Sequence, residues 1–503
     1  MTINVLDFLE KSAEVFPEKT AVIVEDKSIT YQELMEASKI VGSELSSMTN
    51  PGSPVGIYME KGIDALCSMF GAAYAGGFYT VLNTELPGHR LEQIQSVLNA
   101  KVIITSSDLV DDAKEIFGDV VICSIEEIRK GSINGDRLCA IRERVIDTDP
   151  LYINFTSGST SVPKGIAVCH RSVIDFINCF TDIFSINEED IIANQAPFDF
   201  DVSVKDIYSA IKVGATLVIV PRVLFSEPVK LIDYLCDNKV TTMTWAVSAL
   251  CLISTFHGLE YRTPTTVNKI LFSGEVMPYK HLNEWMKHLP DATFVNLYGP
   301  TEITCNCTYH ILESNRDYSQ GLPIGKPFPN EDVFLLDEDD RKITKEGVTG
   351  RIMVRGTALA LGYYHLPEKN STQFIQNPLN KAYPEVVYNT GDLGVYNEDG
   401  ELQFCGRVDN QIKYLGHRIE LEEIERGMAA IEGVERCICY FDEKKSRLKG
   451  FYVGEIEKTD LHATMRDVMP AYMIPGYIRK IETMPLTKNG KIDRKQIAEM
   501  NKG

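Results

Sequence analysis

Short apolar segments alternate with helix-like segments through much of the chain, and this alternation constrains the fold most strongly. Segments typical of buried strands lie at residues 55–58, 102–105, 120–125, 216–220, 269–272 and 293–297. Helix-like segments such as residues 31–47 and 229–238 lie between them. Strands that alternate with helices build α/β layers. We therefore predict a large N-terminal α/β domain with layered sheets.

The pattern changes after Gly350. Residues 350–354, 394–396 and 401–404, with a turn at 398–400, are typical of β-hairpins. A charged tail with a helix at residues 420–431 follows. These features predict a small β-rich subdomain and a domain boundary near Asp409. The expected division is a core of residues 1–408 and a small α+β C-terminal domain of residues 409–503.

The composition narrows the class of protein. A chain of 503 residues is too long for one ordinary core, and 44% hydrophobic with 24% charged residues is typical of globular proteins. The net charge of −20 argues against a nucleic-acid partner. No apolar run has the length of a membrane span, and no signal peptide is evident. Twelve scattered cysteines suit a reducing cytoplasm, and their two C-x-C pairs lack the second half of a zinc site. We expect a cytoplasmic enzyme without a membrane partner.

A loop rich in glycine, serine and threonine follows the apolar run at residues 151–155. Because no bulky side chain blocks the approach, its N–H groups and hydroxyls can surround a polyphosphate, and Lys164 adds a positive charge. It is not the P-loop of NTPases, because Lys164 precedes Gly165 instead of following it. A hydroxyl-rich surface loop is the alternative. The candidate phosphate contacts are Thr156, Ser157, Gly158, Ser159, Thr160 and Lys164.

A second polar cluster, residues 296–302, directly follows a predicted strand, where α/β folds build ligand sites. Tyr298 can stack on a base, Thr301 can hydrogen-bond a phosphate, and Glu302 can hold Mg²⁺ beside it. The alternative is a Gly-Pro turn with a helix-capping threonine.

Three further clusters lie closer to the C-terminus. Asp392 follows a glycine turn, where a carboxylate can accept hydrogen bonds from both ribose hydroxyls. Arg407 and Lys413 lie at the predicted domain boundary and can contact a phosphate or form a hinge. Lys491 follows Asn489-Gly490, a strong tight-turn signal that would hold it at a loop tip. The alternatives are an ordinary turn, a solvated linker and a basic tail.

In order and spacing, these five clusters resemble the core motifs of the adenylate-forming superfamily. Residues 29–34 and 350–363 extend the resemblance over nearly the whole chain. Residues 194–204 and 272–278 are most similar to the amino-acid-activating branch, which includes stand-alone D-alanine–carrier protein ligases and adenylation domains of nonribosomal peptide synthetases. Ser161 and Leu361 depart from the family pattern, which usually has glycine and arginine there.

The resemblance implies two reactions in one site. A substrate carboxylate attacks the α-phosphate of ATP, and a phosphopantetheine thiol then takes the acyl group from the adenylate. No thiolation motif follows in the sequence, so we expect a separate carrier protein. The C-terminal domain would act as a mobile lid that rotates about Asp409. The implied roles are Lys491 on the α-phosphate and substrate carboxylate, Glu302 on Mg²⁺, Thr301 on phosphate, residues 156–160 with Lys164 around pyrophosphate, Asp392 with Arg407 at the ribose, and Gly274, Glu275, Asn296, Tyr298 and Gly299 around adenine.

The resemblance also implies a substrate pocket. In the amino-acid branch an aspartate at the position of Asp201 pairs with the substrate α-ammonium, a strong charge-assisted contact. The alternative is that Asp201 caps the following helix. Several pocket positions are polar, so a small, polar or acidic side chain is expected, with Lys205 pairing a carboxylate; otherwise Lys205 points to solvent. D-alanine is also a candidate. The pocket positions are Asp201, Val202, Lys205, Thr244, Leu271, Ser273, Leu297, Cys305 and Asn306, with Lys491.

Two other functions compete with this one. An acyl- or aryl-CoA ligase shares every ATP motif. A non-catalytic relative would be expected to lack Lys491 or Glu302, and both are present.

Overall fold

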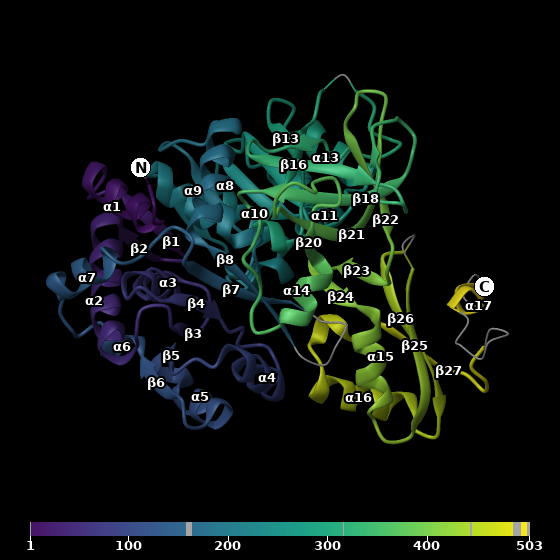
Figure 1. Cartoon of the computed structure of the whole chain (residues 1–503), viewed down its shortest axis with the longest axis horizontal. Coiled ribbons are helices and arrows are strands. Elements are labelled where there is room, and N and C mark those ends of the chain that lie inside the picture. Colours follow the sequence, from purple (N-terminus) through teal and green to yellow (C-terminus); the bar gives the residue numbers. More distant parts are fainter. Residues whose placement is uncertain (1, 157–162, 315, 443–444, 486–493, 500–503) are drawn as a thin grey trace. The chain divides into compact units, whose positions relative to one another are not determined.

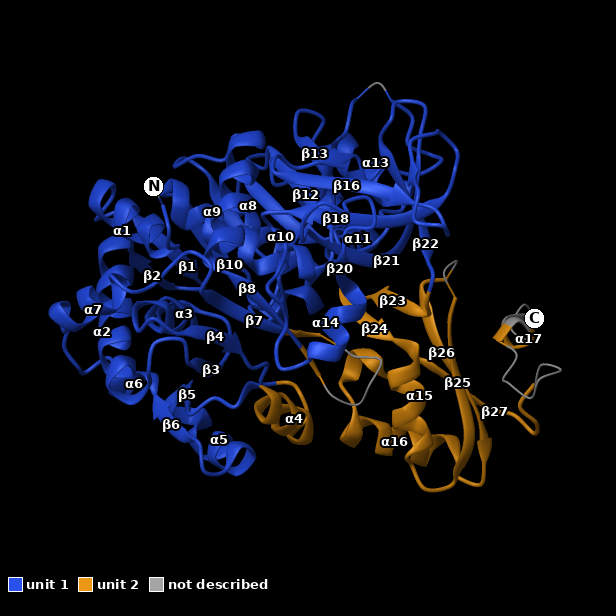
Figure 2. Ribbon diagram, viewed as in Figure 1, with its two compact units in different colours: residues 1–84, 98–154, 165–408 blue, residues 85–97, 155–164, 409–503 orange. Residues whose placement is uncertain are grey.

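The computed structural model describes residues 2–156, 163–314, 316–442, 445–485 and 494–499. The chain forms two compact units (Figure 2). Unit 1 comprises Met1–Thr84, Leu98–Asn154 and Gly165–Val408, and unit 2 comprises Glu85–Val97, Phe155–Lys164 and Asp409–Gly503.

The first sheet has nine strands in the order β15-β14-β13-β12-β11-β9-β10-β1-β2. Figure 1 labels its strands β1, β2 and β13. Its central strands, from β13 across to β1, are parallel, and the strands at both edges are antiparallel. The bounds are β1 Thr20–Val24, β2 Lys27–Thr30, β9 Ile191–Asn194, β10 Thr216–Ile219, β11 Thr242–Ala246, β12 Lys269–Ser273, β13 Thr293–Tyr298, β14 Thr308–Ile311 and β15 Lys326–Pro327.

The second sheet has seven strands in the order β19-β8-β7-β4-β3-β5-β6. Strands β3 to β6 are short and mostly apolar, and β3, β4 and β5 pair in parallel. The bounds are β3 Pro54–Tyr58, β4 Phe78–Val81, β5 Val102–Thr105, β6 Val121–Ser124, β7 Pro150–Thr156, β8 Lys164–Cys169 and β19 Gly362–Tyr363.

A smaller antiparallel sheet completes unit 1, in the order β17-β16-β18-β21-β20 with β22 beside β21. It matches the β-rich subdomain expected from residues 350–404. The bounds are β16 Glu331–Leu336, β17 Lys342–Ile343, β18 Gly350–Gly356, β20 Phe374–Gln376, β21 Val386–Tyr396 and β22 Leu402–Arg407.

Helices of unit 1 pack together with both large sheets in one hydrophobic core. Helix α2 starts with a capping box, in which Thr30 and Glu33 satisfy each other's backbone N–H groups. Its Tyr31 hydroxyl donates to the carbonyls of Ala210, in the last turn of α9, and Ala215, just beyond that helix. The helices are α1 Leu6–Val15, α2 Tyr31–Met48, α3 Ile63–Tyr74, α5 Val110–Phe117, α6 Ile125–Ile128, α7 Gly135–Arg142, α8 His170–Ile183, α9 Val202–Val213, α10 Pro228–Asp237, α11 Val247–Thr255, α12 Gly258–Tyr261, α13 Tyr279–His288 and α14 Pro367–Gln373.

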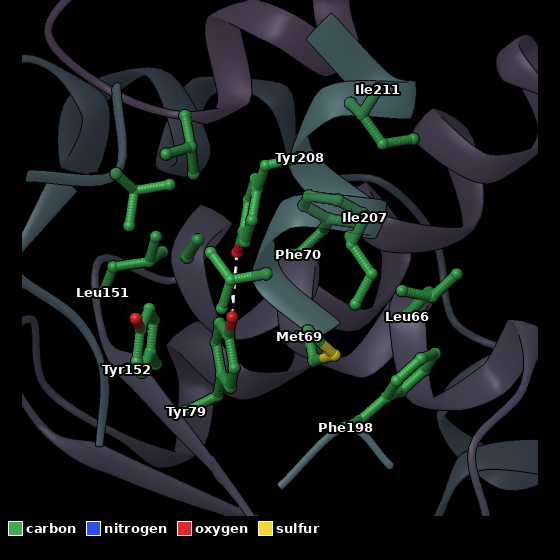
Figure 3. Packing of buried hydrophobic residues seen from close by; sticks show 14 of the residues in the cluster. Leu66, Met69, Phe70, Tyr79, Leu151, Tyr152, Phe198, Ile207, Tyr208 and Ile211 are labelled. Atoms are coloured by element: carbon green, nitrogen blue, oxygen red, sulfur yellow. Dashed lines mark hydrogen bonds between the residues drawn. The ribbon is translucent and has the colours of Figure 1, made fainter. Parts of the chain in front are cut away.

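The largest cluster of buried side chains includes residues from both large sheets and from α2, α3, α8 and α9. Figure 3 shows part of it, where Tyr79 of β4 and Tyr208 of α9 face each other with their hydroxyls 2.9 Å apart. Burying aromatic and aliphatic side chains of this size is the main stabilising contribution to such a core. The cluster therefore joins both sheets to α9, the helix that carries the predicted substrate residues.

Unit 2 has its own core, formed by α15, α16 and the sheet β25-β26-β27. Arg494 of α17 ties this sheet to α15, donating 2.9 Å hydrogen bonds to the Cys439 carbonyl and the Glu425 carboxylate. The bounds are α4 Gly88–Leu98, β23 Gln411–Tyr414, β24 His417–Glu420, α15 Leu421–Ala429, β25 Val434–Asp442, β26 Arg447–Gly454, α16 Lys458–Val468, β27 Tyr477–Lys480 and α17 Arg494–Glu499.

The predicted fold class is confirmed, since layered α/β sheets, a β-rich subdomain and a small α+β unit are all present. The helix expected at residues 420–431 is shorter, Leu421–Ala429, because Glu420 ends strand β24 and Ala430 is the C-cap. Among the described residues, no helix has both the length and the apolar character needed to cross a membrane.

Candidate active site

The carboxyl ends of β12 and β13 place two of the predicted clusters side by side. These strands are parallel neighbours, with Phe272 opposite Asn296. Gly274, just beyond β12, has a φ of 98°, a conformation that glycine adopts without strain. Gly299, just beyond β13, has no room for a side chain, because a Cβ there would lie 2.5 Å from Asn306 Cα. Both predicted adenine loops thus depend on glycine backbones.

Tyr298 and Asp392 are joined directly. The Tyr298 hydroxyl donates a 2.6 Å hydrogen bond to Asp392 Oδ2, and Arg407 forms an ion pair with Oδ1 of the same carboxylate. Asp392 and Arg407 face each other across β21 and β22, so the hairpin fixes the ion pair. Burial, followed by the charge of Asp392, raises the pKa of Tyr298 well above its usual value, so the phenol stays a donor. Arg407 is therefore not part of a solvated linker.

The predicted magnesium ligand, Glu302, lies fully buried in a short 3-10 turn, Thr301–Ile303. Tyr363 donates a 2.7 Å hydrogen bond to Glu302 Oε1. In the described part of the chain, no three His, Cys, Asp or Glu side chains gather closely enough to hold a metal ion alone. A single carboxylate still suits Mg²⁺, which usually binds one or two carboxylates together with substrate phosphates and water. The residues present therefore fit the ion.

The alternative in which Thr301 caps a helix is wrong. Pro300 occupies the cap position of the turn, and no side-chain cap hydrogen bond is present. Asn296, by contrast, is committed to the backbone, since its side-chain amide donates a 2.8 Å hydrogen bond to the Pro323 carbonyl. Asn296 therefore fixes the loop that ends at Gly325, and Thr301 stays a candidate phosphate contact.

Asp201 stands at the cap position of α9, but its side chain makes no cap hydrogen bond to the helix. The alternative that Asp201 is a structural helix cap is therefore wrong. Its backbone carbonyl instead accepts a 3.0 Å hydrogen bond from the Cys305 thiol. Cys305 and its neighbour Thr304 both have positive φ angles, 76° and 47°, which are strained for residues with side chains. A strained loop thus ties the start of α9 to the end of β13.

Lys205 lies one helical turn beyond Asp201 and is buried, with 1% of its surface exposed. Its ammonium donates to Asn306 Oδ1 at 2.8 Å and to Ser273 Oγ at 3.3 Å. The alternative that Lys205 points to solvent is therefore wrong. Burial lowers its pKa, because a charge removed from water is costly. Among the described residues, no carboxylate lies within ion-pair distance of Lys205 Nζ.

The remaining pocket positions surround these contacts from the strands. Thr244 of β11 and Leu271 of β12 are direct neighbours across the sheet, and both are buried. Leu297 is buried in β13, and Val202 opens α9. The structure thus brings Asp201, Lys205, Ser273, Cys305 and Asn306 together through direct contacts, with Thr244 and Leu271 beside them.

Several predicted residues lie elsewhere. Residues 157–160, Ser161 and Lys491 lie outside the described residues, so their positions stay predictions. Thr156 ends β7, and Lys164 begins β8. Within unit 2, Lys164 Nζ lies 3.4 Å from Glu420 Oε1. Asp409, the first residue of the C-terminal part of that unit, is exposed.

Sequence reasoning missed Lys61 and the role of Tyr363. Lys61 follows β3 and contacts the turn that leads to α9. No sequence signal marks it, because its partners lie more than 130 positions away. Tyr363 lies in residues 350–363, which resemble the family, but that resemblance does not indicate a contact with Glu302.

Comparison with known proteins settles the family. A model of the family described as AMP-binding enzyme matches residues 9–364. The chain belongs to this family. Zwittermicin A synthase ZmaJ of Bacillus cereus is 31% identical over 511 residues, which cover 99% of this chain and 95% of that protein.

Two further similarities show the extent of the match. Tyrocidine synthase 1 of Brevibacillus parabrevis is 31% identical over 510 residues, 99% of this chain and 45% of the synthase. This chain thus spans less than half of that relative. The crystal structure of IdnL1 superposes with a TM-score of 0.83 at 26% identity, covering 96% of this chain and 99% of IdnL1. The expected membership of the adenylate-forming superfamily, in its amino-acid-activating branch, is confirmed, as is the class of AMP-forming ligase.

Proposed function

We propose that this AMP-binding enzyme activates an amino acid with ATP as an aminoacyl-adenylate and transfers it to the phosphopantetheine thiol of a separate carrier protein. The observation that carries the proposal is the position of Asp201, which stands at the start of α9 without capping it and lies beside the buried Lys205. A carboxylate there suits a substrate ammonium. The similarity to synthases such as ZmaJ supports the same assignment.

In the first step, the amino acid carboxylate attacks the α-phosphate of ATP, and pyrophosphate leaves. Asp392, fixed by Tyr298 and Arg407, would accept hydrogen bonds from the ribose hydroxyls. Such chemistry depends on positioning and on stabilising negative charge at the phosphate. Lys491 would supply that charge at the α-phosphate, and residues 156–160 with Lys164 would surround the pyrophosphate. Mg²⁺ bound by Glu302 would neutralise phosphate charge.

In the second step, the carrier thiol attacks the adenylate carbonyl, a thioester forms and AMP leaves. We propose that residues 1–408 bind the substrates and that residues 409–503 form a lid that moves about Asp409 between the steps. The resemblance to the family supports this division. We also propose a cytoplasmic location, because the twelve cysteines are unpaired thiols.

The side chain accepted by the pocket is proposed to be acidic or small and polar. Within the described part of the chain, the buried Lys205 ammonium bonds to two neutral oxygens. It would gain most from an anionic partner, because an unpaired buried charge is costly. Lys205 would pair with a side-chain carboxylate of the substrate. D-alanine, favoured by the similarity to D-alanine–carrier protein ligases, is the second candidate.

The test is ATP–pyrophosphate exchange with amino acids of both hands, followed by a search for the thioester. Exchange with aspartate or glutamate supports the acidic pocket, and exchange with alanine alone excludes it. An acyl- or aryl-CoA ligase shares the same ATP residues and is the alternative function. It predicts exchange with a carboxylic acid lacking an amine, and release of a free coenzyme A thioester.

A further inference from the structure

Lys61 occupies an unusual position between β3 and α3. Its ammonium donates to the Gln195 carbonyl at 2.8 Å, to Asn194 Oδ1 at 3.2 Å and to the Asn194 carbonyl at 3.4 Å, and it lies 3.5 Å from the Ala196 carbonyl. One cation therefore bonds the carbonyls of consecutive residues from the last residue of β9 onward. These residues open the turn 195–201, which leads directly into Asp201 and α9.

The same ammonium reaches α9 through Asn194. The Asn194 amide accepts from Lys61 at its oxygen, and its nitrogen donates a 2.9 Å hydrogen bond to Asp206 Oδ2. Asn194 and Asp206 are both fully buried. Asp206 follows Lys205 on the helix, so this relay connects Lys61 to the segment that carries the proposed side-chain contact. Lys61 thus contacts the turn before α9 directly and contacts α9 itself through Asn194.

The charges around Lys61 balance each other only in part. Asp206, Asp199 and Glu60 favour its protonated form, and Arg222 opposes it. Burial has the largest effect and lowers the pKa of the Lys61 ammonium to about 7. Asp199 is itself held by Asn83, whose amide donates to Oδ2 at 3.2 Å. Among the described residues, no carboxylate lies within ion-pair distance of this partly buried lysine, so the carbonyl contacts are what hold its ammonium.

We propose that Lys61 is a positioning residue for the amino acid: by holding the turn 195–201 and Asn194, it sets the position of Asp201 and Lys205. Hydrogen bonds from a charged donor to three carbonyl-type oxygens fix a turn more firmly than neutral contacts. The inference rests on the proposed function, because it concerns the same amino acid site. ATP is proposed to bind other residues, those around Asp392 and Glu302, so we expect the KM for ATP to be largely independent of Lys61.

The experiment compares Lys61→Met and Lys61→Arg with the wild-type full chain in pyrophosphate exchange, varying amino acid and ATP separately. Lys61→Met keeps the length of the side chain but removes the donor. We expect it to raise the KM for the amino acid about tenfold or more while the KM for ATP changes less than about twofold. Lys212→Met is the matched control, because Lys212 is a half-buried lysine at the far end of α9 that bonds Thr181.

A pH series gives a second readout that a purely structural role would not move. As the pH rises through about 7, the wild-type ammonium loses its proton and its hold on the turn. The KM for the amino acid should therefore rise over this range in the wild type and stay flat in Lys61→Arg, whose guanidinium stays charged.

The outcomes separate the inference from the function on which it rests. If the wild-type chain shows no amino-acid-dependent exchange, the proposed function is wrong. Wild-type exchange with an unchanged amino acid KM in Lys61→Met, or with equal rises in both KM values, would overturn the role of Lys61 alone. If Lys61→Met does not fold, the pH series decides, and a wild-type rise that Lys61→Arg shares would reject the inference.

Discussion

The hydroxyl of Tyr298 and the carboxylate of Asp392 lie 2.6 Å apart, although 94 positions separate them in the sequence. One belongs to the predicted adenine loop and the other to the predicted ribose contact. The bond joins β13 of the large parallel sheet to β21 of the small antiparallel sheet. This buried contact within unit 1 therefore connects the residues proposed to bind the base with the residue proposed to bind the sugar.

Replacing Tyr298 by phenylalanine should weaken nucleotide binding. Loss of one hydrogen bond to a charged acceptor is worth about 1.5 kcal/mol or more, so the KM for ATP should rise about tenfold. The KM for the amino acid should change little. Pyrophosphate exchange at varied ATP measures the effect, with Tyr309→Phe on the neighbouring strand β14 as control. Equal ATP affinity in both variants would contradict the assigned role of the contact.

Replacing Asp201 by alanine should harm amino acids far more than their deaminated analogues. The carboxylate is proposed to pair with the α-ammonium, and removal of a charged partner costs about 2–3 kcal/mol or more. Exchange rates with an amino acid and with the matching carboxylic acid give the comparison. Similar losses for both substrates would instead favour the acyl-CoA ligase.

Replacing Lys491 by alanine should separate the two half-reactions. Adenylate formation is expected to be abolished, because the charge proposed for the α-phosphate is lost. Thioester formation from supplied aminoacyl-adenylate should continue. The two rates are measured with pyrophosphate exchange and with loading of a phosphopantetheinylated carrier. Loss of both steps to the same degree would contradict the role assigned to Lys491.

Replacing Lys205 by methionine should change substrate choice rather than the fold. The variant removes a buried charge and keeps a side chain of similar length, so the free energy of unfolding should hold or rise. Exchange with acidic amino acids should fall about a hundredfold, while neutral ones gain. A panel of amino acids and a thermal melt measure both effects. An unchanged panel would place the substrate side chain elsewhere.

His170 should make the protein sensitive to mild acid. It is buried, its Nδ1 accepts a hydrogen bond from the Val5 backbone, and burial lowers its pKa to about 3. Between about pH 6.5 and 3 the unfolded chain binds the proton and the folded one does not, so stability is lost as pH falls. The free energy of unfolding should drop about 2 kcal/mol from pH 7 to pH 5 through this group. Urea unfolding of His170→Asn, which keeps an acceptor, should show a smaller drop; an equal one would exclude the effect.

Strands of both large sheets could be predicted, because a buried parallel strand consists of a short run of apolar residues. Residues 102–104 and 270–272 are continuous apolar runs, and they form most of β5 and most of β12. Helix α2 was predictable for a similar reason, since Thr30 and Glu33 form a capping box at its start.

The contacts inside the site could not be predicted from such local sequence patterns. A lysine in a sequence is expected to be solvated, and the burial of Lys205 follows only from how α9 packs against β12 and the loop after β13. The position of Lys61 likewise depends on which strand ends meet. Asp201 could be singled out by resemblance, but only the helix geometry removed its role as a cap.

The left-handed backbone at Thr304 and Cys305 limits how this pocket can be redesigned. A β-branched residue at position 305 would meet a backbone conformation that it strongly disfavours, whatever ligand it faced. Glycine would relieve the strain but would give up the thiol that holds the Asp201 carbonyl. Libraries that aim at a new substrate should therefore keep Cys305 and vary Thr244 and Lys205, which lie in a regular strand and a regular helix.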